Sequence, residues 1–322
     1  MEAKIKLSLV VPCYNEEGNV ELFFEEVKKC FQGKIDNYEF IFINDGSKDH
    51  TMKKLKKIYG ENAQDNIKVI GFSRNFGKEA AIYAGMQQAE GEYTTVIDAD
   101  LQQRPEVVLS MVDILDKEED YDCVAAFQDK RKEGKILSFF KGAFYKIINM
   151  MAETRFVSGA SDFRTFRSNM REAILSMSEY HRFSKGIFSW VGFETKYISY
   201  EVQERNSGTS KWSFRKLYKY AMDGIVSFSI APLKLAMYVG TITAFLAVVY
   251  MFLIVLQKMI FGIDVPGHAT VVTLILFMGG VQLFFLGVLG EYISKMYIQV
   301  KNRPIYLTRE TYGIDDKDEA NV

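Results

Sequence analysis

VIDADLQQRPE, residues 96–106, is an apolar run that leads into two aspartates one residue apart. Successive side chains of a strand alternate between faces, so Asp98 and Asp100 are expected to point the same way. Two carboxylates this close repel each other, and a position beside a core makes the repulsion costly. A divalent cation would offset it, because Mg²⁺ and Mn²⁺ prefer hard oxygen ligands. The stretch therefore predicts a buried strand that ends in a Mg²⁺ or Mn²⁺ site; the alternative is a solvated turn.

Short apolar runs alternate with helical patterns over the first 130 residues. Strands are predicted at 8–11, 38–43, 67–72, 93–97 and 122–127, and helices at 19–32, 49–59, 78–90 and 105–118. This alternation is typical of an α/β fold with a mostly parallel sheet covered on both faces. Such sheets bind ligands outside the carboxyl ends of their strands. Polar segments follow three of the strands, at 12–16, 44–47 and 98–100, so we expect them to converge on one edge.

The composition excludes several classes of protein. The 322 residues include 40 Lys and Arg against 41 Asp and Glu, a balance that argues against a nucleic-acid partner. Three widely spaced cysteines provide neither a disulfide framework nor a metal-binding pair, which favours a reducing compartment. No G-x-G-x-x-G follows the first strand, and GFSRNFGK at 71–78 has five residues between its glycines where a P-loop has four.

Two stretches of 22 residues without charge, 235–256 and 269–290, lie toward the C-terminus. At about 1.5 Å per residue each makes a helix of roughly 33 Å, enough to cross a hydrocarbon core. Two core helices of a large soluble protein are the weaker alternative. Lys and Arg flank the pair on its outer sides, whereas the loop between them has one lysine and one aspartate. The positive-inside rule then predicts that both termini lie in the cytoplasm.

Small residues recur every four positions in the first of these stretches, at Ala236, Gly240 and Ala244. This spacing suits close helix packing, either between the two spans or in a homo-oligomer, which is the state we expect.

Some polar residues allow both a plain and a functional interpretation. Asp45 either begins a turn or accepts hydrogen bonds from a nucleoside, and Glu16 is either an acid at a helix start or a ligand contact. Residues 204–212, ERNSGTSKW, are either a flexible loop or a lid in which Arg205 and Lys211 meet phosphate oxygens. Residues 213–230 have the mixture of aromatic and basic residues expected of a helix in the membrane interface.

Six segments together resemble a known family: PCYNEE (12–17), NDGSKD (44–49), SRNFGKEAA (73–81), DADLQ (98–102), SDFR (161–164) and GEYISKMYIQVKNRP (290–304). They resemble the polyprenyl-phosphate glycosyltransferases of glycosyltransferase family 2, nearest to the bacterial bactoprenol-phosphate type and more distantly dolichyl-phosphate mannose synthase. The resemblance covers about residues 7–306. It implies a GT-A fold, Rossmann-like with a mostly parallel sheet, that binds a nucleotide-diphosphate sugar.

The resemblance also implies roles for individual residues. The nucleotide sugar would contact Pro12, Tyr14, Glu16, Asp45, Lys78 and Asp98. The divalent cation would be held by Asp98, Asp100 and Gln102, and the catalytic residues would be Asp100 and Asp162. The acceptor phosphate would meet Arg131, Lys141, Arg164, Arg205, Ser210 and Lys211, with surface charge as the plain alternative for Arg131 and Lys141. Gln103 and Arg104 depart from the family's usual Asp-Pro or His-Pro, which alters the charge of this loop.

Asp162 is implied to be a base near the donor's anomeric carbon. A phosphate monoester, with a second pKa of about 6, is largely ionised at neutral pH and needs little deprotonation. A positioning role for Asp162 therefore stays open beside that of a base.

The expected function is the inverting transfer of one sugar, a hexose or N-acetylhexosamine from a UDP-sugar, to undecaprenyl phosphate on the cytoplasmic leaflet of a bacterial plasma membrane. The lipid-linked sugar would supply the modification of a cell-envelope glycan, with a flippase and a second glycosyltransferase acting downstream. A membrane-anchored sensor or scaffold that binds the nucleotide sugar without turnover is the alternative. The expected segments are the GT-A domain at 1–212, an interfacial helix at 213–230, two transmembrane helices within 231–292 and a cytoplasmic tail at 293–322.

Overall fold

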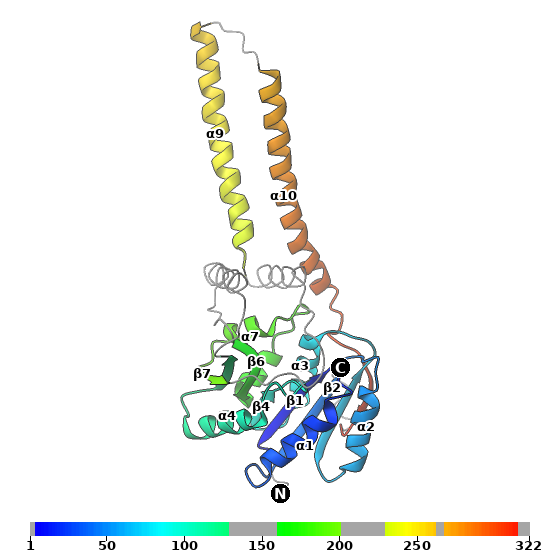
Figure 1. The fold of residues 1–322 in the computed structure, drawn as a ribbon. Coiled ribbons are helices and arrows are strands. Elements are labelled where there is room, and N and C mark those ends of the chain that lie inside the picture. Colours follow the sequence, from blue (N-terminus) through cyan, green and yellow to red (C-terminus); the bar gives the residue numbers. More distant parts are fainter. Residues whose placement is uncertain (1–3, 129–159, 201–228, 262–266, 315–322) are drawn as a thin grey trace.

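The computed structural model describes residues 4–128, 160–200, 229–261 and 267–314, which form one α/β domain and two long helices (Figure 1). The domain contains an eight-stranded sheet with the order β7-β5-β6-β4-β1-β2-β3-β8. Its strands are β1 (Leu7–Cys13), β2 (Tyr38–Asn44), β3 (Asn66–Phe72), β4 (Tyr93–Val96), β5 (Cys123–Gln128), β6 (Ala160–Arg167), β7 (Thr195–Tyr200) and β8 (Thr308–Tyr312). The predicted α/β fold is confirmed, and the five predicted strands agree with β1 to β5 to within a few residues.

The sheet is mixed. Parallel pairs join β1 to β2 and β4, β2 to β3, and β5 to β7. Two strands run the other way: β6 is antiparallel to β4 and β5, and β8 is antiparallel to β3. The carboxyl ends of β1, β2 and β4 therefore lie on one edge, as the sequence predicted, and β6 begins at that same edge.

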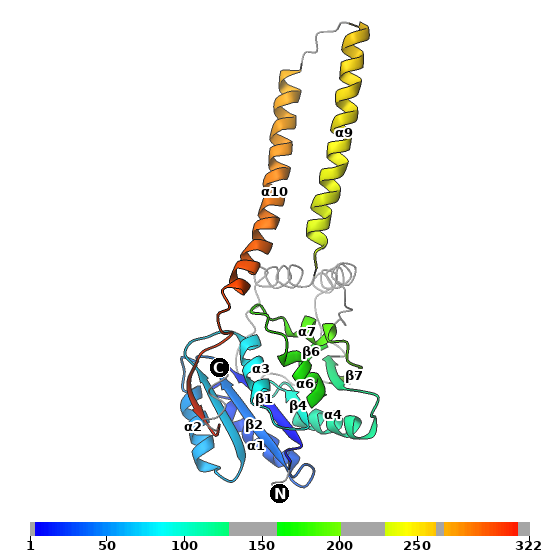
Figure 2. The ribbon, with the colours of Figure 1, turned by 180° about the vertical axis from the view of Figure 1, so that it is seen from behind.

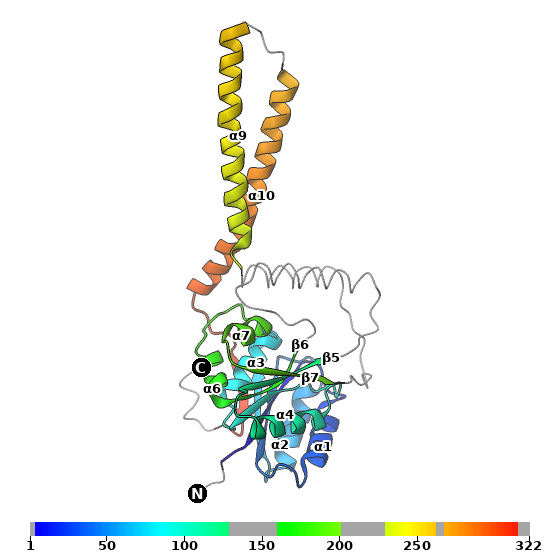
Figure 3. The same cartoon turned by 90° about the vertical axis from the view of Figure 1, so that its left-hand side faces the viewer.

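Helices cover both faces of the sheet (Figure 3). One face packs against α1 (Val20–Phe31), α2 (Thr51–Glu61) and α4 (Pro105–Lys117), and the other against α3 (Lys78–Gln87), α6 (Ser168–Leu175) and α7 (Ser184–Trp190). The alternation of side chains along β1 supplies both cores, because Leu9 and Val11 point to the first and Val10 to the second. Gly85 lets α3 lie close to β1, since a Cβ there would be 2.4 Å from Val10 Cγ1.

The long helices α9 (Ala231–Phe261) and α10 (His268–Val300) project together from one side of the domain (Figures 1 and 2). Their apolar windows, Ala231–Gln257 and Thr270–Val300, have mean hydropathies of 2.5 and 2.3 and are 0 % buried. This exposure distinguishes them from the core helices of a soluble protein, and their position far along the chain distinguishes them from a signal sequence. Two candidate membrane spans are therefore present, and the helices that carry them, α9 and α10, contain the stretches predicted from the sequence.

The segment after α10 returns to the sheet. Tyr306 is buried, stacks on Phe72 with ring centroids 4.8 Å apart, and donates its hydroxyl to Gln87 Oε1 at 2.8 Å. β8 then pairs with β3 and covers that edge of the sheet. The predicted boundary at residue 293 accordingly does not separate a tail from the domain. The predicted interfacial helix at 213–230 lies almost entirely outside the described residues.

Candidate active site

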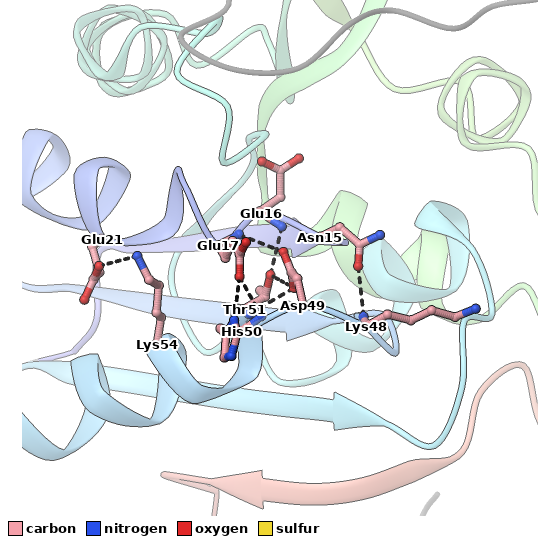
Figure 4. Close-up of polar contacts among 9 residues, drawn as sticks. All are labelled: Asn15, Glu16, Glu17, Glu21, Lys48, Asp49, His50, Thr51 and Lys54. Atoms are coloured by element: carbon pink, nitrogen blue, oxygen red, sulfur yellow. Dashed lines mark hydrogen bonds and ion pairs between the residues drawn. The ribbon is translucent and has the colours of Figure 1, made fainter.

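Two loops at the carboxyl edge of the sheet are hydrogen-bonded to each other (Figure 4). The Asn15 N–H donates to Ser47 Oγ at 3.0 Å, and Asn15 Oδ1 accepts the Lys48 N–H at 2.9 Å. The Glu16 N–H donates to Thr51 Oγ1 at 2.8 Å. Asn15 has a φ of 56°, a left-handed conformation that asparagine tolerates better than most residues. These contacts fix the loop after β1 against the loop after β2.

Neighbouring acids in the first loop have different surroundings. The Glu17 carboxylate accepts the His50 backbone N–H at 2.8 Å and lies 3.0 Å from His50 Nδ1, contacts that lower the pKa of Glu17. Glu16 instead points away from these contacts in Figure 4, and Asn19 Nδ2 donates to its Oε2 at 2.6 Å. Tyr14 is 43 % exposed. Tyr14 and Glu16 therefore lie on the exposed side of this loop, Pro12 is half-buried within β1, and their contacts with a nucleoside stay a prediction.

Asp45 is only 3 % exposed and faces the loop that precedes α3. Its carboxylate accepts the Phe76 N–H at 2.6 Å and the Gly77 N–H at 3.0 Å. Burial raises the pKa of Asp45, and the two N–H contacts act in the opposite direction. Gly46, at a φ of 61°, lies against the same loop, where a Cβ would be 2.3 Å from the Arg74 carbonyl carbon. Asp45 thus holds the SRNFGK loop in place, a role that the sequence did not predict.

Lys78 begins α3 and reaches both predicted acids. Its Nζ lies 2.6 Å from Asp98 Oδ1 and 3.6 Å from Asp162 Oδ2. Burial opposes the charged amine, but Asp98 and Asp162 together hold the pKa of Lys78 above its usual value. The loop held by Asp45 therefore places the positively charged ammonium group of Lys78 at the end of β4.

The register of the sheet explains why Asp98 and Asp162 meet. β4 and β6 are antiparallel, with Tyr93 opposite Arg167 and Val96 opposite Arg164. Continuing this register by two residues places Asp98 opposite Asp162. Asp162 Oδ1 is buried and has no hydrogen-bond partner in the described part of the chain. Burial raises the pKa of Asp162, but Lys78, Lys185 and Arg164 outweigh that effect and leave it lowered.

The predicted metal ligands lie just beyond β4. Asp100 is 9 % exposed and its Oδ1 accepts the Gln102 N–H at 3.1 Å, while Leu101 between them has a φ of 58°. Gln103 Oε1 accepts the Asp98 N–H at 2.9 Å, which fixes the start of this turn. Within the described ranges, no group of three or more His, Cys, Asp and Glu residues could hold a metal ion. The donor set of two carboxylates and an amide oxygen is nevertheless of the kind that a hard divalent cation prefers, and its remaining ligands would have to come from another group such as a diphosphate.

Arg164 is 5 % exposed, and its guanidinium lies over the Phe188 ring of α7 at 3.9 Å from the centroid. α7 is fixed at its start by Glu79, whose Oε2 accepts the Ser184 N–H at 2.9 Å and also the Ser184 hydroxyl. Burial, with a contribution from Asp162, raises the pKa of Glu79 to about 7.

Sequence reasoning missed both Glu79 and Lys185. Glu79 and Ser184, which are hydrogen-bonded to each other, are 105 positions apart in the chain, so no local pattern could indicate their contact. The remaining residues predicted for the acceptor phosphate, Arg131, Lys141, Arg205, Ser210 and Lys211, lie outside the described residues.

Residues 8–174 match the family described as Glycosyl transferase family 2, and residues 231–296 match the GtrB C-terminal hairpin. The chain belongs to glycosyl transferase family 2. The putative glycosyltransferase CsbB of Bacillus subtilis (strain 168) is 43 % identical over 97 % of this chain and 93 % of its own. The SfII prophage-derived bactoprenol glucosyl transferase of Shigella flexneri is 37 % identical over 96 % of this chain and 99 % of its own. The resemblance stated from the motifs is confirmed, and with it the GT-A fold.

Proposed function

We propose that this glycosyltransferase moves one sugar from a nucleotide-diphosphate sugar to a polyprenyl phosphate, undecaprenyl phosphate in bacteria. The observation that carries the proposal is the cluster of Lys78, Asp98, Asp100 and Asp162 at the sheet edge of a domain joined to two long, fully exposed apolar helices. The names of relatives such as the Shigella flexneri bactoprenol glucosyl transferase support a lipid phosphate acceptor and glucose as the first sugar to test. A UDP-sugar is the donor we expect.

In the proposed reaction a lipid phosphate oxygen attacks the anomeric carbon, the bond to the donor's diphosphate breaks, and the nucleoside diphosphate leaves. Attack from the opposite face inverts the configuration. A divalent cation, Mg²⁺ or Mn²⁺, held by Asp98, Asp100 and Gln102 would neutralise charge on the departing diphosphate. Lys78 adds a positive charge at the same place, which favours the leaving group electrostatically.

Asp162 has a lowered pKa and stays ionised at neutral pH. Because the acceptor phosphate is itself largely ionised, removing a proton contributes little to the reaction. We infer that the ionised Asp162 mainly orients Lys78 and Arg164 around the reacting groups. A base role would instead require a pH profile that follows the protonation of Asp162.

The topology we propose follows from the pairing of β8 with β3. β3 precedes both long helices in the chain and β8 follows them, so the chain must return to the side from which it left. If α9 crosses the membrane, α10 must cross it back. Lys234, Lys295, Lys301 and Arg303 lie near the domain end of the two helices, which favours a cytoplasmic domain at the plasma membrane.

A domain on the cytoplasmic side would leave the lipid-linked sugar on the inner leaflet. Its use outside the cell would need a flippase and a second glycosyltransferase, and we propose both as downstream partners. The small residues at Ala236, Gly240 and Ala244 support a homo-oligomer through the long helices.

The test is a transfer assay with detergent-purified protein, undecaprenyl phosphate and labelled UDP-glucose, UDP-N-acetylglucosamine, UDP-galactose or GDP-mannose. Each donor is assayed with Mn²⁺, with Mg²⁺ and with EDTA, and the parent is compared with Asp100→Asn. We expect one donor to label the lipid, with the label lost in EDTA and in the variant. Binding of a nucleotide sugar with no label in lipid from any donor would refute the proposal and favour a sensor or scaffold.

A further inference from the structure

Lys185, in α7, lies beside the proposed site but has no place in the function described so far. It is half-buried and makes no hydrogen bond or ion pair with the described residues. Its charged neighbours are Asp162, Arg164, Lys78 and Glu79. A lysine removed from water without an ion pair is costly, because burial disfavours the charged form. Consistent with this, burial lowers the pKa of Lys185.

Two contacts determine where Lys185 lies. Glu79 binds the N–H and the hydroxyl of Ser184, the residue directly before it, and so fixes the first turn of α7. Phe188, three residues later, packs under the Arg164 guanidinium. Residues three apart share one face of a helix, so Lys185 is on the face of α7 that packs on β6. Contacts on either side of Lys185, at Ser184 and at Phe188, therefore fix the turn of α7 that carries this lysine next to the site.

The charges around Asp162 are unbalanced. Lys78 already pairs with Asp98 and Asp162, while Arg164 and Lys185 add two more cations beside Asp162. Glu79 offsets this only in part, because its pKa is raised to about 7. An anion with several oxygens would balance the group and give Lys185 the partner that it lacks among the described residues.

The position of α7 indicates where that anion comes from. Figures 1, 2 and 3 show α7 on the side of the domain from which α9 and α10 project. If α9 and α10 span the membrane as proposed, a lipid phosphate would enter from their side of the domain. A donor diphosphate would instead lie by Asp98 and Asp100.

We propose that Lys185 is a phosphate-binding residue that holds the phosphate of the lipid acceptor beside Asp162. The hydrogen bonds from Ser184 to Glu79, called the Glu79 clamp below, position Lys185 for this role. The ligand chemistry is a phosphate group, and the acceptor is the source we assign. This inference rests on the proposed transfer to a polyprenyl phosphate.

The experiment compares the parent with Lys185→Met, with Lys185→Arg as the conservative variant and Lys117→Met as the control. Lys117 is an exposed lysine of α4 that pairs with Asp113. Binding of undecaprenyl phosphate and of undecaprenol, which lacks the phosphate, is measured on the full-length protein in detergent micelles. Affinity for the nucleotide sugar and the KM and kcat for both substrates are measured in parallel.

For Lys185→Met we expect the affinity for undecaprenyl phosphate to fall about 10- to 100-fold, as for the loss of one charge-assisted hydrogen bond. The affinities for undecaprenol and for the nucleotide sugar should stay within about twofold of the parent. Lys185→Arg should recover most of the loss, and Lys117→Met should show none. Comparing the affinities of the parent and of Lys185→Met for undecaprenyl phosphate and for undecaprenol isolates the contribution of the phosphate contact, as a double-mutant cycle does.

Two results would overturn the assignment. If the nucleotide sugar loses affinity while the lipid phosphate does not, the phosphate that Lys185 holds belongs to the donor. If both lipids weaken equally in Lys185→Met, the lysine has only a structural role. Failure of the proposed function is separate, because it would appear in the parent as absence of transfer from every donor.

Discussion

Asp45 offers a sharp test of how the site is built. In Asp45→Asn, one carboxylate oxygen that accepts the Phe76 or Gly77 N–H becomes an amide donor that faces another donor. Losing one hydrogen bond to a buried charged group costs about 1.5–3 kcal/mol. For a domain of this size that corresponds to a Tm lowered by roughly 4–10 °C. The variant should therefore be destabilised even without any nucleotide.

The assay for Asp45→Asn is thermal unfolding of the detergent-solubilised protein, measured with and without nucleotide sugar. Asp113→Asn, which changes an exposed acid of α4, is the matched control and should leave Tm almost unchanged. Donor affinity should also fall, because the SRNFGK loop that carries Lys78 is no longer fixed. An unchanged Tm together with a large loss of donor affinity would refute this reasoning and restore Asp45 to the purely nucleoside-binding role expected from the sequence.

Three further changes test the proposed metal site, the hydrogen bonds of Glu79 to Ser184, and the packing of α3 on β1. Asp100→Asn should weaken Mn²⁺ binding at least tenfold in a titration and slow transfer roughly 100-fold; unaltered Mn²⁺ affinity would remove Asp100 from the site. Because the pKa of Glu79 is raised from 4.5 to about 7 in the folded protein, folding stability is lost as the pH rises from about 4.5 to about 7. Glu79→Gln should abolish this loss, of which at most roughly 2 kcal/mol falls between pH 5.5 and pH 8, the two values at which Tm is compared; parallel curves for the parent and the variant would contradict it. Gly85→Ala should destabilise by about 1–3 kcal/mol through its clash with Val10, whereas Gly60→Ala, with open space around it, should stabilise slightly in chemical unfolding.

The first half of the fold was predictable because its signals are local. β1, β2, β3 and β5 are mainly apolar runs, β4 is the β-favouring YTTV, and α1 to α4 are amphipathic or bounded by turn residues, so each element can be identified alone. β6 and β8 could not be predicted in the same way. β8, with the sequence TRETY, is a polar edge strand whose pairing with β3 depends on residues more than 200 positions away. Such strands owe their structure to the neighbouring strand rather than to their own composition.

The site shows the same division. Convergence of Asp98, Asp45 and Glu16 on one edge follows from the parallel strands, a general property of such sheets. The meeting of Asp98 with Asp162 depends on the antiparallel register of β6, and the clamp of Glu79 on Ser184 depends on how α7 packs. Both are set by tertiary contacts, which no window of sequence contains.

The return of β8 to the sheet has a consequence for how the protein is made. A ribosome completes β1 to β7 first, then the two long apolar helices, and only afterwards the residues that cover the open edge of β3. During this interval the unpaired backbone of β3 could join the edge of another chain. Because Tyr306 and β8 follow α10 in the chain, closure of that edge would, if α9 and α10 cross the membrane as proposed, report that both helices have been inserted in the correct orientation. A chain whose second helix failed to cross would keep an uncovered edge, the kind of surface that quality-control proteases and chaperones bind.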